Sequence, residues 1–262
     1  MITNQASTFG STDSKRIGLL VPSSNVVMEV EFYRSLPNDI TVHTSHIPRS
    51  NQAITPAAMQ QTTDNAIGAA AALVQAELDL VVHGHTASSY VGGIQGDIEL
   101  ARKIGEAACA PGMTAAEAAV RCLRSFGAKR LWLAAPYPRA TTQTSADFMM
   151  AQGFEVASLE CLGVDQATNL KKVSAEAIYE LGMRAAAQGD ADALFFSGTG
   201  VHTLAVVGPL ERAIGKPVIT ANLAALWGAL DRLGRADAFR FGESRLIEWQ
   251  RERVSRPNHR EV

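Results

Sequence analysis

The sequence predicts an α/β protein in which helices cover both faces of parallel sheets. Short runs rich in aliphatic and β-branched residues alternate with helical patterns along most of the 262 residues. Hydrophobic residues make up 47% of the chain and charged residues 19%, a balance that allows a buried core. Residues 80–86 and 194–200 are similar to each other, because each is an apolar run that opens into a loop of small residues.

The strands are predicted from short apolar runs that end at glycine, proline or small polar residues. Seven such runs are found, at residues 16–24, 40–47, 78–85, 130–137, 154–162, 193–198 and 217–221. The helices are predicted from the longer segments between them. These are residues 25–36, 55–77, 92–108, 114–127, 141–153, 174–189, 203–215 and 222–234.

Two of these helices have clear start signals. Thr55 can cap the helix that Pro56 begins, since proline is favoured in a first turn. Thr114 and Glu117 form a capping box, in which each side chain satisfies a free backbone amide of the other residue. The similarity between residues 80–86 and 194–200 fits two lobes that face each other across a cleft, although a chance match of such short segments is the alternative.

Composition excludes several classes of protein. The formal net charge of −2 gives no basic surface for nucleic acid, and no apolar run reaches the roughly 20 residues that span a membrane. Residues 1–14 lack the apolar core of a signal peptide, so we expect a flexible tail there and a cytoplasmic protein. Cys109, Cys122 and Cys161 are widely spaced, which indicates free thiols in a reducing compartment.

Polar residues gather where three predicted strands end. These loops are residues 21–25, 83–89 and 197–200, and each precedes a helix whose free amides and dipole favour an anion. Ligands of open α/β sheets bind beyond the carboxyl ends of strands. We therefore expect a carboxylate site where the three loops converge; helix capping by Ser, Thr and Asn is the alternative for any single loop.

Histidines provide the candidate acid/base. His85 lies at the mouth of its loop and could change charge near neutral pH, whereas His83 is expected in the core or behind His85. His83 and His85 could share a face of the strand and act as two metal ligands. The sequence does not indicate that His43, His46 or His202 lies near them as a third ligand, so we expect no metal site. The glycines of these loops do not form GxGxxG, and the sequence contains no P-loop and no GxSxG elbow, so nucleotide binding and α/β-hydrolase chemistry are not supported.

Four segments, which together span residues 16–234, carry a family resemblance: "RIGLLVPSSNVVMEVEF", "LAAPYP", "SGTGVHTLAVVGPLERAIGKPVITAN" and "ALWGALDRLG". They resemble the maleate cis-trans isomerase and arylmalonate decarboxylase family of the aspartate/glutamate racemase superfamily. The resemblance implies two pseudo-symmetric Rossmann-like lobes with a cofactor-free active site in the cleft between them. We expect an N-terminal lobe of residues 15–112 with 222–246, a C-terminal lobe of residues 113–221, and a charged tail at 247–262.

The departures from the family are informative. Isomerases and racemases of this kind carry one cysteine per lobe, and these positions fall at His85 and at Gly198 or Thr199. Because isomerisation through a thiolate needs that nucleophile, the thiol mechanism is disfavoured. The family's decarboxylases instead use an oxyanion hole and one proton donor. The positions of this chain that match that oxyanion hole are Thr86, Tyr137 and the amides around Gly198 and Thr199, although Ala87 replaces an expected serine.

These observations predict a cofactor-independent decarboxylase, or an enzyme of enediolate-type proton transfer, that acts on a small carboxylic acid. The catalytic residues are expected to be His85, Thr86, Tyr137 and Thr199. The substrate-binding residues are expected to be Pro22, Ser24, Asn25, Ser197, Gly198, Gly200 and His202. Three alternatives remain: an isomerase without a thiol, a hydrolase in which His85 activates water, and a binding protein without catalysis. A homodimer or higher homo-oligomer is also expected, with the apolar helix "NLAALWGAL" as a candidate contact.

Overall fold

The computed structural model describes residues 14–49, 53–238 and 244–255, and it contains two four-stranded parallel sheets. The strands are β1 Lys15–Pro22, β2 Ile40–Ile47, β3 Leu80–His83, β4 Gly112–Thr114, β5 Arg130–Ala135, β6 Glu155–Cys161, β7 Ala193–Phe196 and β8 Val218–Thr220. The α-helices are α1 Met28–Ser35, α2 Pro56–Ala71, α3 Thr86–Val91, α4 Gly93–Ala108, α5 Ala115–Ser125, α6 Arg139–Ala151, α7 Ala167–Leu170, α8 Ala175–Ala186, α9 Leu204–Ile214, α10 Ala221–Arg232 and α11 Arg245–Ser255.

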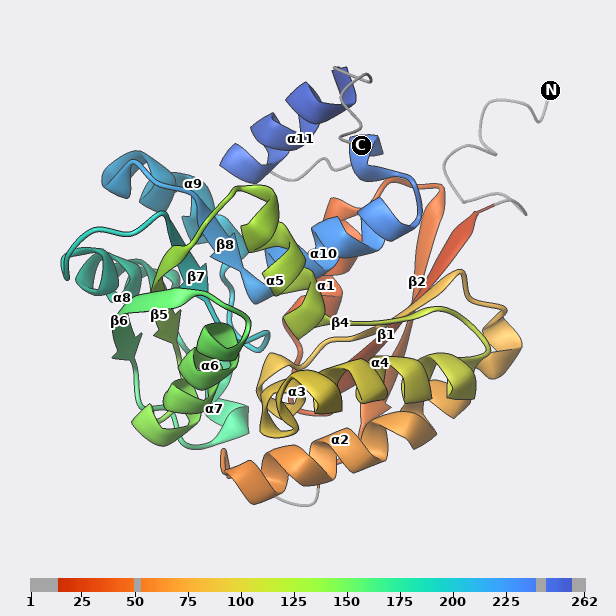
Figure 1. Cartoon of the computed structure of the whole chain (residues 1–262). Coiled ribbons are helices and arrows are strands. Elements are labelled where there is room, and N and C mark those ends of the chain that lie inside the picture. Colours follow the sequence, from red (N-terminus) through yellow and green to blue (C-terminus); the bar gives the residue numbers. More distant parts are fainter. Residues whose placement is uncertain (1–13, 50–52, 239–243, 256–262) are drawn as a thin grey trace.

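The two sheets have the same topology. The first has the order β2-β1-β3-β4 and the second the order β6-β5-β7-β8, and all strand pairs are parallel. Strands β3 and β7, which contain the two similar sequence segments, occupy the same third position. The predicted α/β class and the two pseudo-symmetric lobes are therefore confirmed, and Figure 1 shows the two sheets side by side with helices around them.

The seven predicted strands and eight predicted helices are all present, with altered ends. The predicted cap of α2 forms, because the Thr55 side chain accepts a hydrogen bond from the Ala58 amide. Half of the predicted capping box of α5 forms: the Thr114 side chain accepts from the Glu117 amide, whereas the Glu117 carboxylate pairs with Arg232. The prediction missed β4, α3, α7 and α11, most of which are too short to show a periodic pattern. Residues 1–13 of the predicted N-terminal tail lie outside the described residues.

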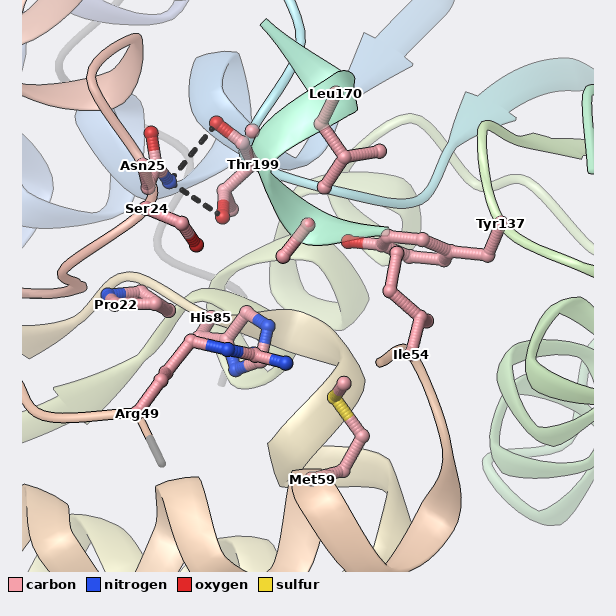
Figure 2. A pocket seen from close by; sticks show the side chains of 12 residues that line it. Pro22, Ser24, Asn25, Arg49, Ile54, Met59, His85, Tyr137, Leu170 and Thr199 are labelled. Atoms are coloured by element: carbon pink, nitrogen blue, oxygen red, sulfur yellow. Dashed lines mark hydrogen bonds between the residues drawn. The ribbon is translucent and has the colours of Figure 1, made fainter. Parts of the chain in front are cut away.

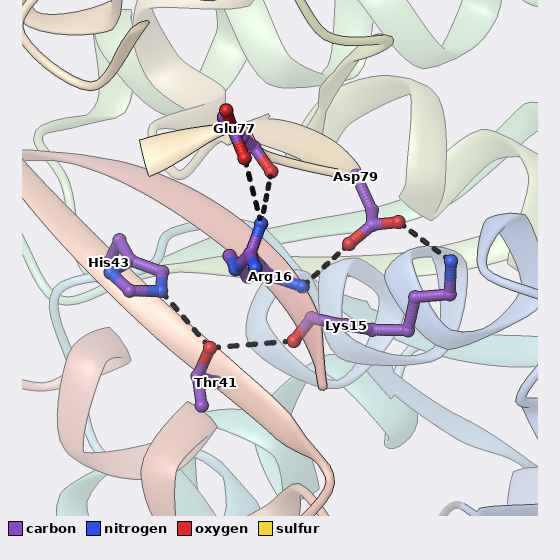
Figure 3. Close-up of polar contacts among 6 residues, drawn as sticks. All are labelled: Lys15, Arg16, Thr41, His43, Glu77 and Asp79. Carbon is purple, nitrogen blue, oxygen red and sulfur yellow. Dashed lines mark hydrogen bonds and ion pairs between the residues drawn. The ribbon is translucent and has the colours of Figure 1, made fainter. Parts of the chain in front are cut away.

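Polar contacts join the amino ends of the first sheet, at the edge opposite the candidate site (Figure 3). Lys15 Nζ lies 2.7 Å from Asp79 Oδ1, and the Arg16 amide donates to Asp79 Oδ2 at 2.9 Å. On the neighbouring strand, Thr41 Oγ1 and His43 Nε2 are 3.0 Å apart. Exposed pairs of this kind add little stability each, and the backbone pairing of β1 with β2 and β3 sets the register of these strands.

Helices α5 and α10 join the two lobes. They pack against each other, and each contacts strands of both sheets: α5 contacts β4 and β8, and α10 contacts β3 and β8 (Figure 1). The "NLAALWGAL" segment belongs to α10, and its side chains are buried in the protein, with Trp227 only 2% exposed. The expectation that this segment is an exposed apolar face for a second copy is therefore wrong, because α5 covers it within the same chain. The oligomeric state stays a prediction.

The segment predicted as a charged tail, residues 247–262, begins as helix. Helix α11 extends to Ser255, and Leu246 and Ile247 are buried against the core, so the apolar residues hold the start of the segment in place. Residues 256–262 lie outside the described part of the chain. Within the described residues, no helix combines the length and the apolar character needed to cross a membrane.

Candidate active site

A cavity of about 340 Å³, part of it open to solvent, lies between the two lobes. Loops that follow β1, β3, β5 and β7 meet there, as expected for the carboxyl ends of central parallel strands. Figure 2 shows side chains from both lobes pointing into this space. The lining residues are Pro22, Ser24, Asn25, Arg49, Ile54, Met59, His85, Tyr137, Ala167, Leu170, Thr199 and Gly200.

Most of the predicted site residues meet at the cavity. The lining includes Pro22, Ser24, Asn25, His85, Tyr137, Thr199 and Gly200. The other four predicted residues, Thr86, Ser197, Gly198 and His202, do not line it. His202 is exposed, and Ser197 is buried behind the loop, where its hydroxyl lies 3.3 Å from Tyr90 Oη and 3.1 Å from Ser145 Oγ. Thr86 is fully buried beside the Tyr90 and Tyr137 hydroxyls.

Asn25 and Thr199 connect the lobes across the cavity. Asn25 Nδ2 donates to the Thr199 carbonyl at 3.2 Å and to Thr199 Oγ1 at 3.1 Å (Figure 2). Asn25 Oδ1 accepts from the amides of Val27 and Met28 at the start of α1. Thr199 Oγ1 in turn donates to the Gly84 carbonyl at 2.8 Å. The loops after β1, β3 and β7 are thus held together by one threonine, which fixes the backbone amides around it.

A buried carboxyl group supports the same loop. Glu31 on α1 accepts hydrogen bonds from Asn222 Nδ2 at 2.5 Å and from the Leu204 amide at 3.5 Å. Asn222 Nδ2 also donates to the Thr199 carbonyl at 3.3 Å. Burial raises the pKa of the Glu31 carboxyl from 4.5 to about 7, and these hydrogen bonds oppose that effect only in part.

The Glu31→Gln variant is expected to change how stability depends on pH. A carboxyl whose pKa is raised on folding stabilises the protein at low pH, and this contribution is lost as pH rises from about 4.5 through 7. Glutamine has no such titration, so the free energy of unfolding of the variant relative to wild type should rise by about 3 kcal/mol over this range. Urea denaturation of both proteins at several pH values measures this difference in the free energy of unfolding. A difference that does not change with pH would contradict the raised pKa.

His85 is the candidate acid/base of the cavity. It precedes α3, its side chain is buried apart from 6% exposure, and its Nδ1 lies 2.9 Å from Ser88 Oγ. This contact leaves Nε2 for a substrate. Burial lowers the pKa of His85 well below 6.5, and the nearby His83 and Arg49 lower it further. His85 is therefore neutral at neutral pH, a state that can accept or donate one proton.

Tyr137 lines the cavity from the second lobe. It is 2% exposed, and burial raises the pKa of its hydroxyl to about 12, so the hydroxyl remains protonated and can donate a hydrogen bond. The Thr199 backbone amide lies beside the same hydroxyl. This amide hydrogen-bonds the tyrosine oxygen, and the hydroxyl proton can then be donated to a negatively charged oxygen in the cavity.

Gly198 makes this arrangement possible. Its φ of +121° lies in a region that L-residues rarely adopt, and a Cβ there would lie 2.9 Å from Tyr137 Oη and 3.1 Å from Pro136 Cδ. A side chain at this position would press on Tyr137, whereas the side chain of the following Thr199 already lines the cavity. Glycine therefore lets the loop pass close to the Tyr137 hydroxyl.

We expect Gly198→Ala to lower the free energy of unfolding by about 3 kcal/mol, from backbone strain and the clash with Tyr137 together. Gly127→Ala is the matched control, because Gly127 has a φ of +68° and its Cβ would meet nothing within 4 Å. The control should lose only about 1 kcal/mol, the cost of a left-handed conformation. Chemical denaturation of both variants measures the difference, and equal losses would show that the clash with Tyr137 is relieved at no cost.

Sequence reasoning missed Arg49, which follows the carboxyl end of β2. Its side chain is half-buried, lines the cavity near His85, and donates to the Ala53 carbonyl at 3.0 Å (Figure 2). Burial lowers the pKa of Arg49, but a guanidinium stays charged at any ordinary pH. The described lining contains no carboxylate. An available signal was overlooked: β2 pairs with β1 in parallel, so the first cation after β2 belongs to the same edge as Asn25.

The three cysteines all fall in the described part of the chain, and none of them lines the cavity. Cys122 is buried in the core, and burial raises the pKa of its thiol. Cys109 is exposed at the end of α4, and Cys161 ends β6. The described residues also include no group of three or more His, Cys, Asp or Glu side chains placed to hold a metal ion.

Comparisons with known proteins agree with this architecture. Residues 17–247 match the model of a family described as arylmalonate decarboxylase. The chain is 24% identical to the arylmalonate decarboxylase of Bordetella bronchiseptica, over 88% of this chain and 96% of that protein. It is 26% identical to a maleate isomerase of Pseudomonas putida, over 85% and 93% of the two chains.

Solved structures show the same fold. The maleate cis-trans isomerase of Nocardia farcinica bound to Tris superposes with a TM-score of 0.81, at 24% identity over 92% of this chain and 99% of that chain. Unliganded arylmalonate decarboxylase gives a TM-score of 0.75 at 23% identity, over 90% and 99% of the two chains. The family match covers nearly the whole two-lobed fold and all the loops around the cavity. The chain therefore belongs to the arylmalonate decarboxylase family.

Proposed function

We propose that this protein is a cofactor-independent enzyme that decarboxylates a small carboxylic acid, or moves a proton on it, through an enediolate, with His85 as the acid/base. The observation that carries the proposal is that His85 and Tyr137 line one cavity that no cysteine reaches. The relatives include both a decarboxylase and maleate isomerases, and a cavity without a thiol favours decarboxylation over isomerisation through a thiolate.

The proposed reaction uses groups from both lobes. In a malonate-type substrate, the bond between the α-carbon and one carboxylate breaks, CO₂ leaves, and the electron pair moves onto the remaining carboxylate. Tyr137 Oη, whose oxygen accepts a hydrogen bond from the Thr199 amide, donates a hydrogen bond to the enediolate oxygen that gains charge. Nε2 of His85 then gives a proton to the α-carbon. Thr86 and Gly198 contribute by keeping Tyr137 in position.

Arg49 is proposed to bind the substrate's carboxylate, together with the hydroxyl of Ser24. We expect Arg49→Met to raise KM about tenfold to a hundredfold while kcat changes little, because a charge-assisted hydrogen bond made equally in the ground and transition states is lost. Arg34→Met, which removes an exposed cation from the last turn of α1, is the control. Steady-state kinetics of both variants and the wild type measures kcat and KM. A fall in kcat without a change in KM would assign Arg49 to the chemical step instead.

The function is tested by proton NMR of the purified protein in D₂O with arylmalonates, alkylmalonates, maleate, hydroxy-diacids, cyclic imides and lactones. The expected result is loss of one carboxyl group with deuterium at the α-carbon, or deuterium exchange at that carbon alone. Conversion of maleate to fumarate would overturn the claim that the missing thiols prevent isomerisation. Ring opening or water addition would instead support a hydrolase, and saturable binding without turnover would support a binding protein.

A further inference from the structure

Two side-chain amides hold the carbonyl of Thr199. Asn25, which follows β1, donates to it at 3.2 Å, and Asn222, in the first turn of α10, donates to it at 3.3 Å. The backbone amide of Thr199 hydrogen-bonds the hydroxyl oxygen of Tyr137, which lines the cavity. The position of Thr199 therefore affects where the Tyr137 hydroxyl lies, and a residue that fixes Thr199 can act on the reaction from outside the cavity.

The Asn222 amide is itself fixed by Glu31. Asn222 Nδ2 donates to Glu31 Oε2 at 2.5 Å as well as to the Thr199 carbonyl. Asn222 is 1% exposed, and its Oδ1 is buried without a hydrogen-bond partner in the described part of the chain. Both hydrogen bonds of this amide therefore come from Nδ2, and the one to Glu31 is the shorter. Without an acceptor at residue 31, the Thr199 carbonyl alone would keep the amide from rotating.

Capping of α9 does not by itself account for Glu31. Its Oε1 accepts from the Leu204 amide at 3.5 Å, at the start of this helix. Thr203 directly precedes α9, yet its hydroxyl is buried and makes no hydrogen bond to a described residue. A hydroxyl is a common helix cap and costs less to bury than a carboxyl group. The contact that Thr203 could not replace is the one between Glu31 and Asn222.

We propose that Glu31 and Asn222 are positioning residues: Glu31 fixes the Asn222 amide, which holds Thr199 where its own amide orients the Tyr137 hydroxyl toward the reacting oxygen. This inference rests on the proposed function, in which Tyr137 donates to the enediolate. Neither Glu31 nor Asn222 lines the cavity, so both act without contacting the substrate. Because the hydrogen bond from Tyr137 matters most in the transition state, loss of this support should lower kcat and leave KM nearly unchanged.

The kinetic test compares Glu31→Leu with Glu31→Gln. Both variants remove the carboxyl group, but glutamine keeps an oxygen that can accept from Asn222 and leucine does not. We expect Glu31→Leu to lower kcat about tenfold to a hundredfold, the cost of a small misplacement in an active site, and Glu31→Gln to restore most of it. An equal loss in both variants, a loss that appears in KM instead, or wild-type kcat in Glu31→Leu would overturn the proposal.

Glu211→Leu is the matched control. Glu211 on α9 is 4% exposed and accepts from the amides of Val218 at 2.9 Å and Arg245 at 2.8 Å, so it is also a buried carboxyl group that binds backbone amides. It does not line the cavity, and these bonds lead to β8 and α11. The control should lose thermal stability and keep kcat. If both leucine variants lower kcat equally, the loss comes from the general stability of the fold and the positioning role is wrong.

A double variant identifies the path of the effect. If Glu31 acts through Tyr137, adding Glu31→Leu to Tyr137→Phe should cost no further kcat, because residues that act as a unit are not additive. Losses that multiply would overturn this path. Asn222→Ala breaks the same link from its other end, and we expect the same loss of kcat from it, also without a further loss in the Tyr137→Phe background. The test therefore stands even where Glu31→Leu does not fold.

A last measurement does not depend on turnover. The NMR signals of the Thr199 carbonyl carbon and backbone amide respond to the hydrogen bonds that these groups make. We expect both signals to shift in Glu31→Leu and in Asn222→Ala, and to stay close to their wild-type positions in Glu31→Gln and Glu211→Leu. Unshifted Thr199 signals in Glu31→Leu and Asn222→Ala would overturn the positioning role. The expected shifts in a protein that converts none of the substrates would instead refute the proposed function, while the link from Glu31 to Thr199 would stand.

Discussion

Replacing His85 by glutamine is expected to lower kcat by a factor of about 100 to 10,000, the range that a positioned general acid or base contributes. Glutamine fills a similar volume and keeps a polar group near Ser88, so the fold should persist while the proton transfer is lost. The substrate found by NMR is used to measure kcat and KM. Because the pKa of His85 lies well below 6.5, wild-type activity should persist as pH falls through the range where histidines ordinarily gain charge.

The control for this variant is His43→Gln. His43 lies on β2 beside Thr41 and does not line the cavity, so its replacement should leave both kinetic constants unchanged. A His85→Gln enzyme that keeps kcat and only raises KM would contradict the acid/base role. That result would support the binding-protein alternative, since an imidazole that only contacts the ligand contributes equally to the ground and transition states.

The fold was predictable because its information is local. Each lobe is a series of strands and helices whose apolar runs and caps can be read within about 20 residues, as at Thr55 and Thr114. The resemblance between residues 80–86 and 194–200 identified the strands that occupy equivalent sheet positions. Strand β4 was missed because three residues carry no periodic signal, and its position is set by pairing with β3.

The site was predictable only in part, because some of its residues are positioned by tertiary packing and not by local sequence. Residues at the strand ends, such as Asn25 and Tyr137, are found because the edge of a parallel sheet is a known binding position. Ile54, Met59 and Leu170 reach the cavity through tertiary packing, from segments whose sequence gives no sign of it. The burial of α10 was misjudged similarly: its apolar face fits an oligomer contact as well as an interior, and only the packing against α5 distinguishes the two.

Replacing Tyr137 by phenylalanine is expected to lower kcat by about 100- to 1,000-fold, which corresponds to the roughly 3–4 kcal/mol that one oxyanion donor can supply. The hydroxyl is lost while the ring, which packs in the core, is retained. The enediolate oxygen carries more negative charge than the carboxylate from which it forms, so the lost hydrogen bond matters most in the transition state. KM should therefore change much less than kcat.

Tyr90→Phe is the matched control, because Tyr90 is equally buried and belongs to the same polar cluster but does not line the cavity. Its hydroxyl accepts from Ser197 Oγ at 3.3 Å, so the variant measures what the loss of a buried phenol costs the fold alone. If both variants lower kcat equally, the effect is one of packing, and Tyr137 is not an oxyanion donor. If only Tyr137→Phe does so while thermal stability remains close to that of Tyr90→Phe, the hydroxyl acts on the reacting oxygen, because position in the cavity is the main difference between the two residues.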